Sequence, residues 1–207
     1  GPAADGVTLL GNGTLVPDTG GVVVRNFASG NKIGGAFAGE GNVIAGNRVG
    51  VLLFSGTRNS VQGNSISDNA QGGIVLTGSG VLDRGDADEA GANREINTPR
   101  LDVQVDSTNV WATARTDSFA PNVTFPVAVD IYKSVGGQGA QFIGRIGLNA
   151  PDTPVRVNLG TRAALGIDPG SLLVANATDL FGNSSAFTAE TVAGRILTVD
   201  STGVEQD

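Results

Sequence analysis

The sequence contains no cysteine, no methionine and no histidine. Without cysteine the chain has no disulfide bonds and no thiolate ligands for zinc. Without histidine it has no Ser-His-Asp or Cys-His catalytic system, and no imidazole to act as general acid or base. Any chemistry of this chain therefore depends on carboxylates, amides, hydroxyls, arginine and the backbone.

Positive charge is scarce, because 13 Lys and Arg stand against 20 Asp and Glu and give a net charge of −7. A field of this sign repels phosphate backbones, so we expect no nucleic-acid partner. The longest uncharged apolar runs, such as Gly50–Phe54, have four or five residues, whereas a bilayer-spanning helix needs roughly 20 apolar residues. We therefore expect no membrane span.

The first two residues, Gly1 and Pro2, are typical of the scar that a protease leaves after removal of an expression tag. On this interpretation, the absence of a signal peptide carries no information. The missing initiator methionine and the abrupt start predict that the sequence is a fragment of a longer protein.

Glycine is abundant and unevenly distributed, since residues 1–80 hold 19 of the 32 glycines. In this part, short β-branched runs alternate with Gly and Asn, and no apolar stripe recurs at helical spacing. We expect no helix there, and strands alone.

The same part contains internal repeats. One tetrad occurs three times, at Gly21–Val24, Gly50–Leu53 and Gly73–Leu76, and Gly41–Asn47 recurs 22 residues later as Gly63–Asn69. The period is 22 or 23 residues and is lengthened once by about six. A unit this short cannot bury an apolar face alone, so it must stack on copies of itself.

Stacking of the repeats predicts the position of each asparagine. A 22-residue coil closes one triangular turn and pairs each strand with its equivalent about 4.8 Å away in the next coil. Asn42 then lies over Asn64, and Asn47 lies over Asn69, as amide ladders. The expected aliphatic interior consists of Val43, Ile44, Val49, Val51, Leu53, Ile66, Ile74 and Leu76.

Asn42–Leu53 and Asn64–Leu76 resemble the N-x-I-x-x-N-x-x-G-I-x-L coil of right-handed parallel β-helix proteins. The resemblance covers residues 21–80 and implies a short right-handed parallel β-helix of about three coils. A further coil is expected at residues 5–20, so the coils occupy residues 5–82. Such coils occur in lyases, hydrolases, epimerases, phage spikes and adhesins, so the resemblance predicts a fold and leaves the function open.

Acidic residues are concentrated where the repeat stops, in a junction that we place at residues 83–99. Four of them fall within seven residues, at Asp83, Asp86, Asp88 and Glu89, and a cation relieves their mutual repulsion most directly. Alternating Asp around a Gly turn is typical of calcium ligands, which Asn amide oxygens supplement. Two interpretations stay open: a solvated acidic connector, or a calcium site formed by Asp83, Asp86, Asp88 and Asn93.

Alternation with a period of two begins at residue 100 and predicts an antiparallel β-sandwich over residues 100–200. Seven short strands separated by turns are typical of immunoglobulin or fibronectin domains. The predicted strands are 101–105, 110–114, 127–132, 142–146, 155–159, 172–178 and 186–189, and residues 195–200 are a candidate eighth, edge strand. Without cysteine, the core is expected to rest on Trp111, Phe125, Ile131, Phe142 and the Val and Leu positions. The predicted class of the whole chain is therefore all-β.

Residues Ala175–Phe187 resemble the A-T-D-x-x-G-N-x-S-x-F ending of bacterial Ig-like repeats in large surface proteins. In those proteins coils, a Gly-Asp-x-Asp junction, a sandwich and this ending follow in the same order. The resemblance implies an extracellular or cell-surface protein. Read as a hairpin turn, the ending begins at Asp179 and places Gly182 and Asn183 at positive φ.

Three functions remain compatible with these observations. The favoured one is a non-catalytic structural or adhesive segment, whose partner is a polysaccharide or another surface protein. The second is a polysaccharide-binding module, in which Trp111 and Tyr132 stack on sugar rings. The third is the remnant of a β-helix polysaccharide lyase or hydrolase, although no pair of carboxylates recurs on successive coils. The oligomeric state is left open.

Overall fold

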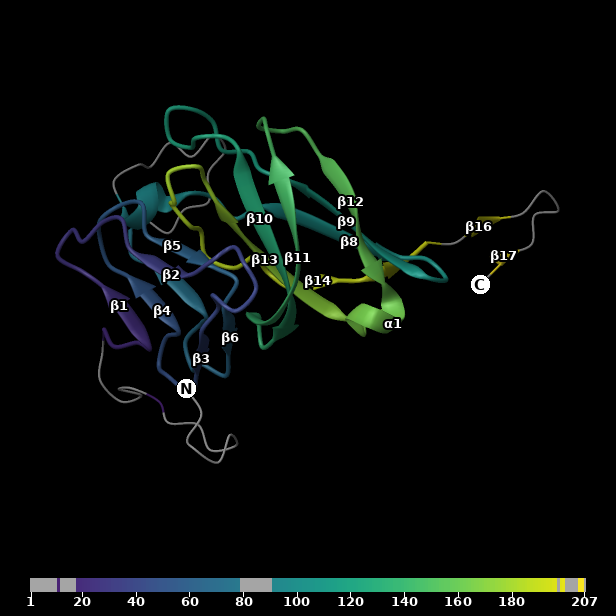
Figure 1. The fold of residues 1–207 in the computed structure, drawn as a ribbon, viewed down its shortest axis with the longest axis horizontal. Coiled ribbons are helices and arrows are strands. Elements are labelled where there is room, and N and C mark those ends of the chain that lie inside the picture. The colour runs from purple at the N-terminus through teal and green to yellow at the C-terminus, as the bar shows by residue number, and fades with distance from the viewer. Residues whose placement is uncertain (1–10, 12–17, 79–90, 197, 200–204, 207) are drawn as a thin grey trace.

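The computed structural model describes residues 11, 18–78, 91–196, 198–199 and 205–206 (Figure 1). Among these residues, nearly all regular structure is β. The helical elements are the 3₁₀ turn η1 (Ala92–Glu95) and the single-turn helix α1 (Arg162–Leu165). No helix in the described part of the chain is long and apolar enough to cross a membrane. The chain has parallel sheets in its first half and mainly antiparallel sheets in its second half (Figure 1).

Residues 18–78, which we call the coil stack, form three parallel sheets. Strands β1 (Val22–Val24), β4 (Val51–Leu53) and β7 (Ile74–Leu76) make the first. Strand β2 (Lys32–Gly34) pairs with β5 (Ser60–Gln62), and β3 (Val43–Ala45) pairs with β6 (Ser65–Ser67). Every strand thus pairs with its equivalent one coil along the chain, in register, as the repeat predicts. The β3–β6 pair joins residues 22 apart, whereas the first coil is longer because of an inserted loop at residues 36–41.

The interior of the coil stack is aliphatic. Its fully buried members include Val51, Leu53, Val61 and Ile66. Val43 was expected there but is 58% exposed, so that prediction is wrong. Within a strand successive side chains point to opposite faces, and the neighbouring Ile44 occupies the inward position.

Residues 100–196, which we call the two-sheet unit, contain two four-stranded sheets. One sheet has the order β11 (Gln138–Leu148), β10 (Val127–Val135), β13 (Leu172–Thr178), β14 (Thr191–Val192). The other has the order β12 (Val155–Thr161), β9 (Asn109–Arg115), β8 (Arg100–Val105), β15 (Gly194–Arg195). Their inward side chains share one core, which includes Val103, Val110, Val129, Ile131 and Leu173. The β15–β8 pairing is parallel, and all others in these sheets are antiparallel.

Two of the strand predictions for this unit are wrong in position. Residues 186–189 do not form a strand, because the Phe187 side chain packs against the core of the coil stack. The sheet instead continues one turn later through β14. The predicted eighth strand is only the two-residue β15, and the next pairing joins β16 (Thr198–Val199) to β17 (Glu205–Gln206).

The expectation for the aromatic core is also partly wrong. Ile131 is fully buried and Phe125 packs against the core, as expected. Trp111 is only half-buried, since Val110 and Ala112 take the inward positions of β9 and turn Trp111 to the outer face. Phe142 is 40% exposed. Val, Ile, Leu and Ala side chains therefore fill most of the space between the sheets.

Strand β10 belongs to the two-sheet unit and also contacts the coil stack. Val129 and Ile131 face the core between the two sheets, whereas Asp130 and Tyr132 share the other face and are buried as well. That second face meets the coil stack at Gly63, between β5 and β6, and the neighbouring strands β11 and β13 contact β6 and β5 (Figure 1). The two-sheet unit thus covers the last coil.

Candidate functional site

The predicted asparagine pairs lie over one another in the coil stack. Asn42 donates from its backbone N–H and from its Nδ2 to Oδ1 of Asn64, each at 3.0 Å. Asn47 donates in the same two ways to Oδ1 of Asn69 at 3.0 Å. The Asn64 Nδ2 donates back to the carbonyl of Ile33 at 2.9 Å. The stacked amides therefore pair backbone groups at corners where the strands have ended.

A third ladder has the same hydrogen-bond pattern and consists of Asn31, Asn59 and Asn93, the last of which lies outside the coil stack. Asn31 donates from its N–H and Nδ2 to Oδ1 of Asn59, at 3.2 and 2.8 Å. The Asn59 N–H donates to Oδ1 of Asn93 at 3.0 Å. Asn93 returns a bond of 2.7 Å to the Asn59 carbonyl and donates at 3.0 Å to the Ser184 carbonyl. Asn93, which the sequence assigned to a calcium site, thus continues an asparagine ladder in this structure.

The ladder of Asn47 and Asn69 is capped by a side chain of the two-sheet unit. The N–H and Nδ2 of Asn69 donate to Oε1 of Gln138 at 3.2 and 2.9 Å, and the Gln138 Nε2 donates to the Asn69 carbonyl at 2.8 Å. Gln138 is the first residue of β11 and is 6% exposed. Its amide takes the place that the asparagine of a next coil would occupy.

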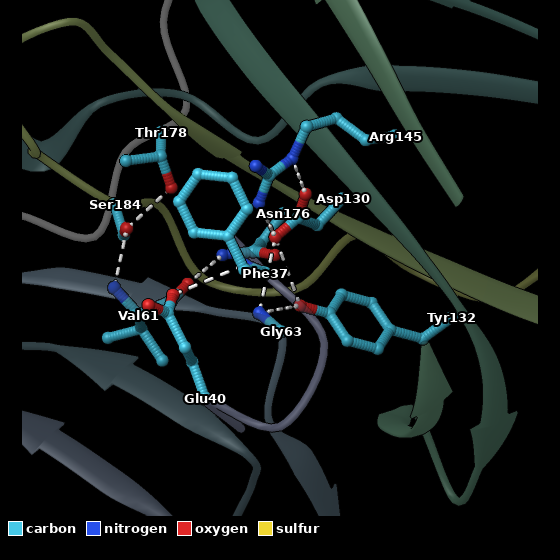
Figure 2. A network of polar contacts seen from close by, with 10 residues as sticks. All are labelled: Phe37, Glu40, Val61, Gly63, Asp130, Tyr132, Arg145, Asn176, Thr178 and Ser184. Atoms are coloured by element: carbon cyan, nitrogen blue, oxygen red, sulfur yellow. Dashed lines mark hydrogen bonds and ion pairs between the residues drawn. The ribbon is translucent and has the colours of Figure 1, made fainter. Parts of the chain in front are cut away.

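Between these caps, a buried charged group binds the coil backbone (Figure 2). The Gly63 N–H donates to the Tyr132 hydroxyl oxygen at 3.0 Å and to Oδ2 of Asp130 at 3.3 Å. The Tyr132 hydroxyl also donates to Oδ2 of Asp130, at 3.3 Å. Arg145, on β11, holds the same carboxylate through two nitrogens, with its Nη2 at 2.9 Å. The Asp130 side chain is 2% exposed, and both of its carboxylate oxygens accept hydrogen bonds.

The β5 strand receives further bonds from β13 and from the segment that follows it (Figure 2). Asn176 Nδ2 donates to the Val61 carbonyl at 2.9 Å, and the Val61 N–H donates to Oγ of Ser184 at 2.9 Å. The Ser184 hydroxyl is also hydrogen-bonded to the Thr178 hydroxyl at 2.6 Å. We call the contacts of Asp130, Tyr132, Gln138, Asn176 and Ser184 with the coils the polar seam.

The ending motif also contributes to this contact, in a way that its turn chemistry did not predict. Asn183 Oδ1 accepts the N–H of Arg58 at 2.7 Å, and the Asn183 N–H is held by Oδ1 of Asp179 at 2.8 Å. Gly182 has a φ of +93°, as expected, but Asn183 does not lie in the left-handed region. That part of the prediction is wrong because the Asn183 amide binds the coil, and no turn position requires its backbone.

Burial and hydrogen bonding shift the pKa values of two side chains at the polar seam, Tyr132 and Arg145. Burial raises the pKa of the Tyr132 hydroxyl far above 10.0, and the neighbouring Asp130 charge raises it further. The hydrogen bond to Asp130 raises the pKa of the Arg145 guanidinium. Tyr132 therefore stays neutral and Arg145 stays charged at physiological pH.

Of the four predicted calcium ligands, the structure describes Asn93 alone. Asp83, Asp86 and Asp88 lie outside the described residues, and the Asn93 amide faces Asn59 and Ser184. In the ranges 18–78 and 91–196, no three acidic side chains gather closely enough to hold a metal ion. The calcium site stays a prediction.

The two aromatic platforms predicted for sugar stacking are largely covered. Tyr132 is 2% exposed and makes edge contacts with Phe142 and Phe187, so its proposed role is wrong. Trp111 is half-buried, donates its indole N–H to Asp106 at 2.8 Å and carries the Arg156 guanidinium 4.9 Å above its ring. The backbone N–H of Asn109 and this indole lower the pKa of Asp106 to about 2.

Sequence reasoning missed most of the polar seam, although one signal was present. In the predicted strand 127–132, Asp130 and Tyr132 alternate with Val129 and Ile131 and therefore share one face. The prediction for Tyr132 on that face was sugar stacking. A Tyr beside an Asp on it is compatible with burial against a second polar surface, but nothing in the sequence names the coil as that surface.

Comparisons with known proteins gave little. No protein-family model matches the chain, and no curated protein matches it. Among solved structures, the adhesin domain of Epf from Streptococcus pyogenes is similar over 50% of this chain and 34% of that chain. The sequence identity is 13% and the TM-score is 0.35. The match thus spans about a third of that domain's length.

Proposed function

We propose that this chain is a non-catalytic structural segment of a bacterial secreted or cell-surface protein. In this proposal the coil stack is a short right-handed parallel β-helix, and the two-sheet unit is an Ig-like sandwich that caps it. The segment holds the two as one rigid body and supports adhesion to a polysaccharide or another surface protein.

The polar seam is the observation that carries the proposal. Unpaired polar groups at the end of a strand stack are costly to bury, at about 1–3 kcal/mol each. The two-sheet unit supplies partners for the backbone N–H groups of Val61, Gly63 and Asn69. A joint that satisfies groups in this way resists hinge motion, because rotation breaks several buried hydrogen bonds together. Rigidity of this kind suits a stalk or an adhesive segment.

The order of the strands supports the Ig-like part of the proposal. If β8 to β14 are lettered A, B, C, C′, E, F and G, the sheets contain A-B-E and C′-C-F-G. Ig-like domains distribute their strands between two sheets in this manner. The paired coils and asparagine ladders support the β-helix part in the same way.

The buried ionisable groups support a non-catalytic role. Asp130 and Arg145 neutralise one another, and burial holds Tyr132 in its neutral form. On the coil surface, Glu40 lies 3.8 Å from Lys32 and accepts the Phe37 N–H at 3.2 Å. These carboxylates act as acceptors within the fold.

Calorimetry tests the rigid body. We expect one transition, with a calorimetric enthalpy equal to the van't Hoff enthalpy, because the halves share buried bonds. Gln138→Ala, which removes one cap, is expected to lower the transition temperature, whereas the exposed Gln141→Ala should leave it unchanged. Two separate transitions in the unaltered protein would contradict the proposal.

Two further measurements test catalysis and location. Incubation with polygalacturonate should give no rise in the absorbance of unsaturated uronate products and no new reducing ends. Antibodies against this segment should label intact cells of the source bacterium without permeabilisation. Turnover of the polymer, or labelling only after lysis, would overturn the corresponding part of the proposal.

A further inference from the structure

Exposed phenylalanines and arginines follow one another along one corner of the coil stack. Phe27 lies at the first corner and is 83% exposed, and Phe181 lies on the turn of the ending motif and is 56% exposed. The Arg25 guanidinium lies 5.9 Å from the Phe54 ring centre, and the Arg58 guanidinium lies 5.3 Å from that of Phe181. We call Arg25, Phe27, Phe54, Arg58 and Phe181 the corner row.

The members of the corner row are held next to one another by backbone contacts. The N–H of Phe27 donates to Oγ of Ser55 at 2.9 Å, which fixes the corner of the first coil on that of the second. The N–H of Arg58 donates to Asn183 at 2.7 Å, which fixes the second corner on the turn that carries Phe181. The row is therefore a built surface on a rigid support.

The backbone of the corner row is strained. Asn26, Phe27 and Arg58 have φ values of +57°, +58° and +60°. A bulky side chain in the left-handed region is rare and costs about 1–3 kcal/mol. At Phe27 this conformation presents an aromatic ring to solvent, so it contributes no core packing. Strained residues of this kind cluster at ligand-binding sites.

A hollow lies at each end of the corner row. The first has a volume of about 410 Å³ and is lined by Asp18, Arg25, Asn26, Phe27, Phe54 and Ser55. The second has a volume of about 400 Å³, and its lining includes Phe181, Ser60 and Gln62. Each hollow thus combines an aromatic ring with hydroxyl or amide groups, as binding sites for small polar molecules do.

The charges of the corner row favour an uncharged ligand. Arg25 shares its hollow with Asp18, and Asp179 lines the hollow beside Phe181, so each hollow contains a carboxylate. The chain as a whole has a net charge of −7, which repels polyanions and anionic membranes.

We propose that the corner row binds an uncharged polysaccharide. The apolar C–H faces of successive pyranose rings stack on Phe27 and Phe181, and sugar hydroxyls bond to Asn26, Gln62 and the guanidinium edges. The row spans the coil stack and the two-sheet unit through the bond between Arg58 and Asn183, so this proposal rests on the proposed function. Each phenylalanine contributes a weak contact, and a polymer that spans both hollows gains by occupying them together.

Affinity electrophoresis with the intact chain tests the proposal. Gels containing hydroxyethyl cellulose, xyloglucan or galactomannan are compared with a gel containing polygalacturonate. We expect retardation by at least one neutral polymer and none by polygalacturonate. The double variant Phe27→Ala with Phe181→Ala should weaken that binding at least tenfold. Phe37→Ala, at an equally exposed ring outside the row, should bind as the unaltered protein does.

The remaining outcomes also decide the matter. Retardation by none of the neutral polymers, retardation by polygalacturonate alone, or undiminished binding by the double variant would overturn the proposal. Row-dependent binding to phosphatidylglycerol vesicles without any polysaccharide binding would assign the row to membranes instead. The double variant must keep the unfolding transition of the unaltered protein, because both rings are exposed. Two calorimetric transitions would refute the rigid body, whereas a single transition without binding to any neutral polymer would refute the corner row alone.

Discussion

Tyr132 combines the two kinds of contact that hold the molecule together. Its ring packs edge-on against Phe142 and Phe187, with centroids 5.6 and 5.5 Å away. Its hydroxyl accepts the Gly63 N–H and donates to Asp130. Burial raises its pKa above the ordinary value of 10.0. It is also the only tyrosine of the chain, so its ionisation can be observed directly.

Stability should therefore fall at alkaline pH. The pKa of Tyr132 is higher in the folded protein than in the unfolded chain. Its contribution to the free energy of unfolding is therefore complete below pH 10. Above pH 10 this contribution decreases, because the unfolded chain loses the tyrosine proton and the folded protein keeps it. We expect a loss of about 1.4 kcal/mol per pH unit above that point. Urea unfolding between pH 8 and pH 11 measures the slope, and Tyr132→Phe should remove it. A tyrosinate signal from the folded protein with a midpoint near 10 would contradict this prediction.

Asp130→Asn tests the ion pair of the polar seam. The substitution removes the charge that holds Arg145 and leaves a half-buried cation with a neutral partner. We expect a loss of about 3–5 kcal/mol in the free energy of unfolding, measured in urea. Asp168→Asn is the matched control, since its pair with Arg162 is exposed and contributes less than about 1 kcal/mol. Equal losses in the two variants would show that burial of the pair has no effect.

In the asparagine ladders, the contribution of each asparagine to stability depends on its position in the coil stack. Asn64 accepts two bonds from Asn42 and donates to the Ile33 carbonyl, whereas Asn42 is exposed at the first coil. Asn64→Ala should cost about 1–3 kcal/mol, because polar groups lose their partners in a buried position. Asn42→Ala should cost less than about 1 kcal/mol. The urea midpoints of both variants give the comparison. A larger loss of stability in Asn42→Ala than in Asn64→Ala would contradict the prediction that the buried asparagine of the ladder matters more.

The same elements show what the sequence could predict. Asn42 and Asn64 are 22 residues apart in a repeated pattern, so their contact follows from the period alone. The contacts of Asn176 with Val61 and of Ser184 with the same residue join positions 115 and 123 residues apart, and no repeat relates them. Each half could be predicted from local patterns, but the seam could not, because it depends on the complementarity of two unlike surfaces.

The alternation rule also explains the errors. It places Ile44 and Val110 inward and therefore turns Val43 and Trp111 outward, although both are apolar. Both side chains were assigned to a core because they are apolar. Their position in the alternation along the strand, however, decides which face of the sheet they occupy. Phe187 departs from its predicted strand for a different reason, since its ring packs against the core of the coil stack.

In the whole molecule, the two-sheet unit covers one end of the coil stack. The ends of a stack of parallel strands carry backbone groups without strand partners. The last coil exposes backbone donors that would otherwise pair with a next coil or with another molecule. Here Ser184, Tyr132 and Gln138 accept those donors from three separate elements of the two-sheet unit. The two-sheet unit thus caps the coil stack, and neither half is expected to be stable by itself.

Hydrogen exchange can show whether this cap ever opens. If the halves separate before they unfold, the N–H groups of Val61, Gly63 and Asn69 exchange through a low-energy opening. If the polar seam is part of the cooperative core, these three amides exchange only with global unfolding, as fast as the amide of Ile131 in the two-sheet core. We expect the second result, because separation would break the buried hydrogen bonds of all three N–H groups together. Gln138→Ala should then raise exchange at Asn69 more than at Val61, because Gln138 accepts only the first of these amides. Faster exchange of all three seam amides than of Ile131 in the unaltered protein would show that the joint is a hinge.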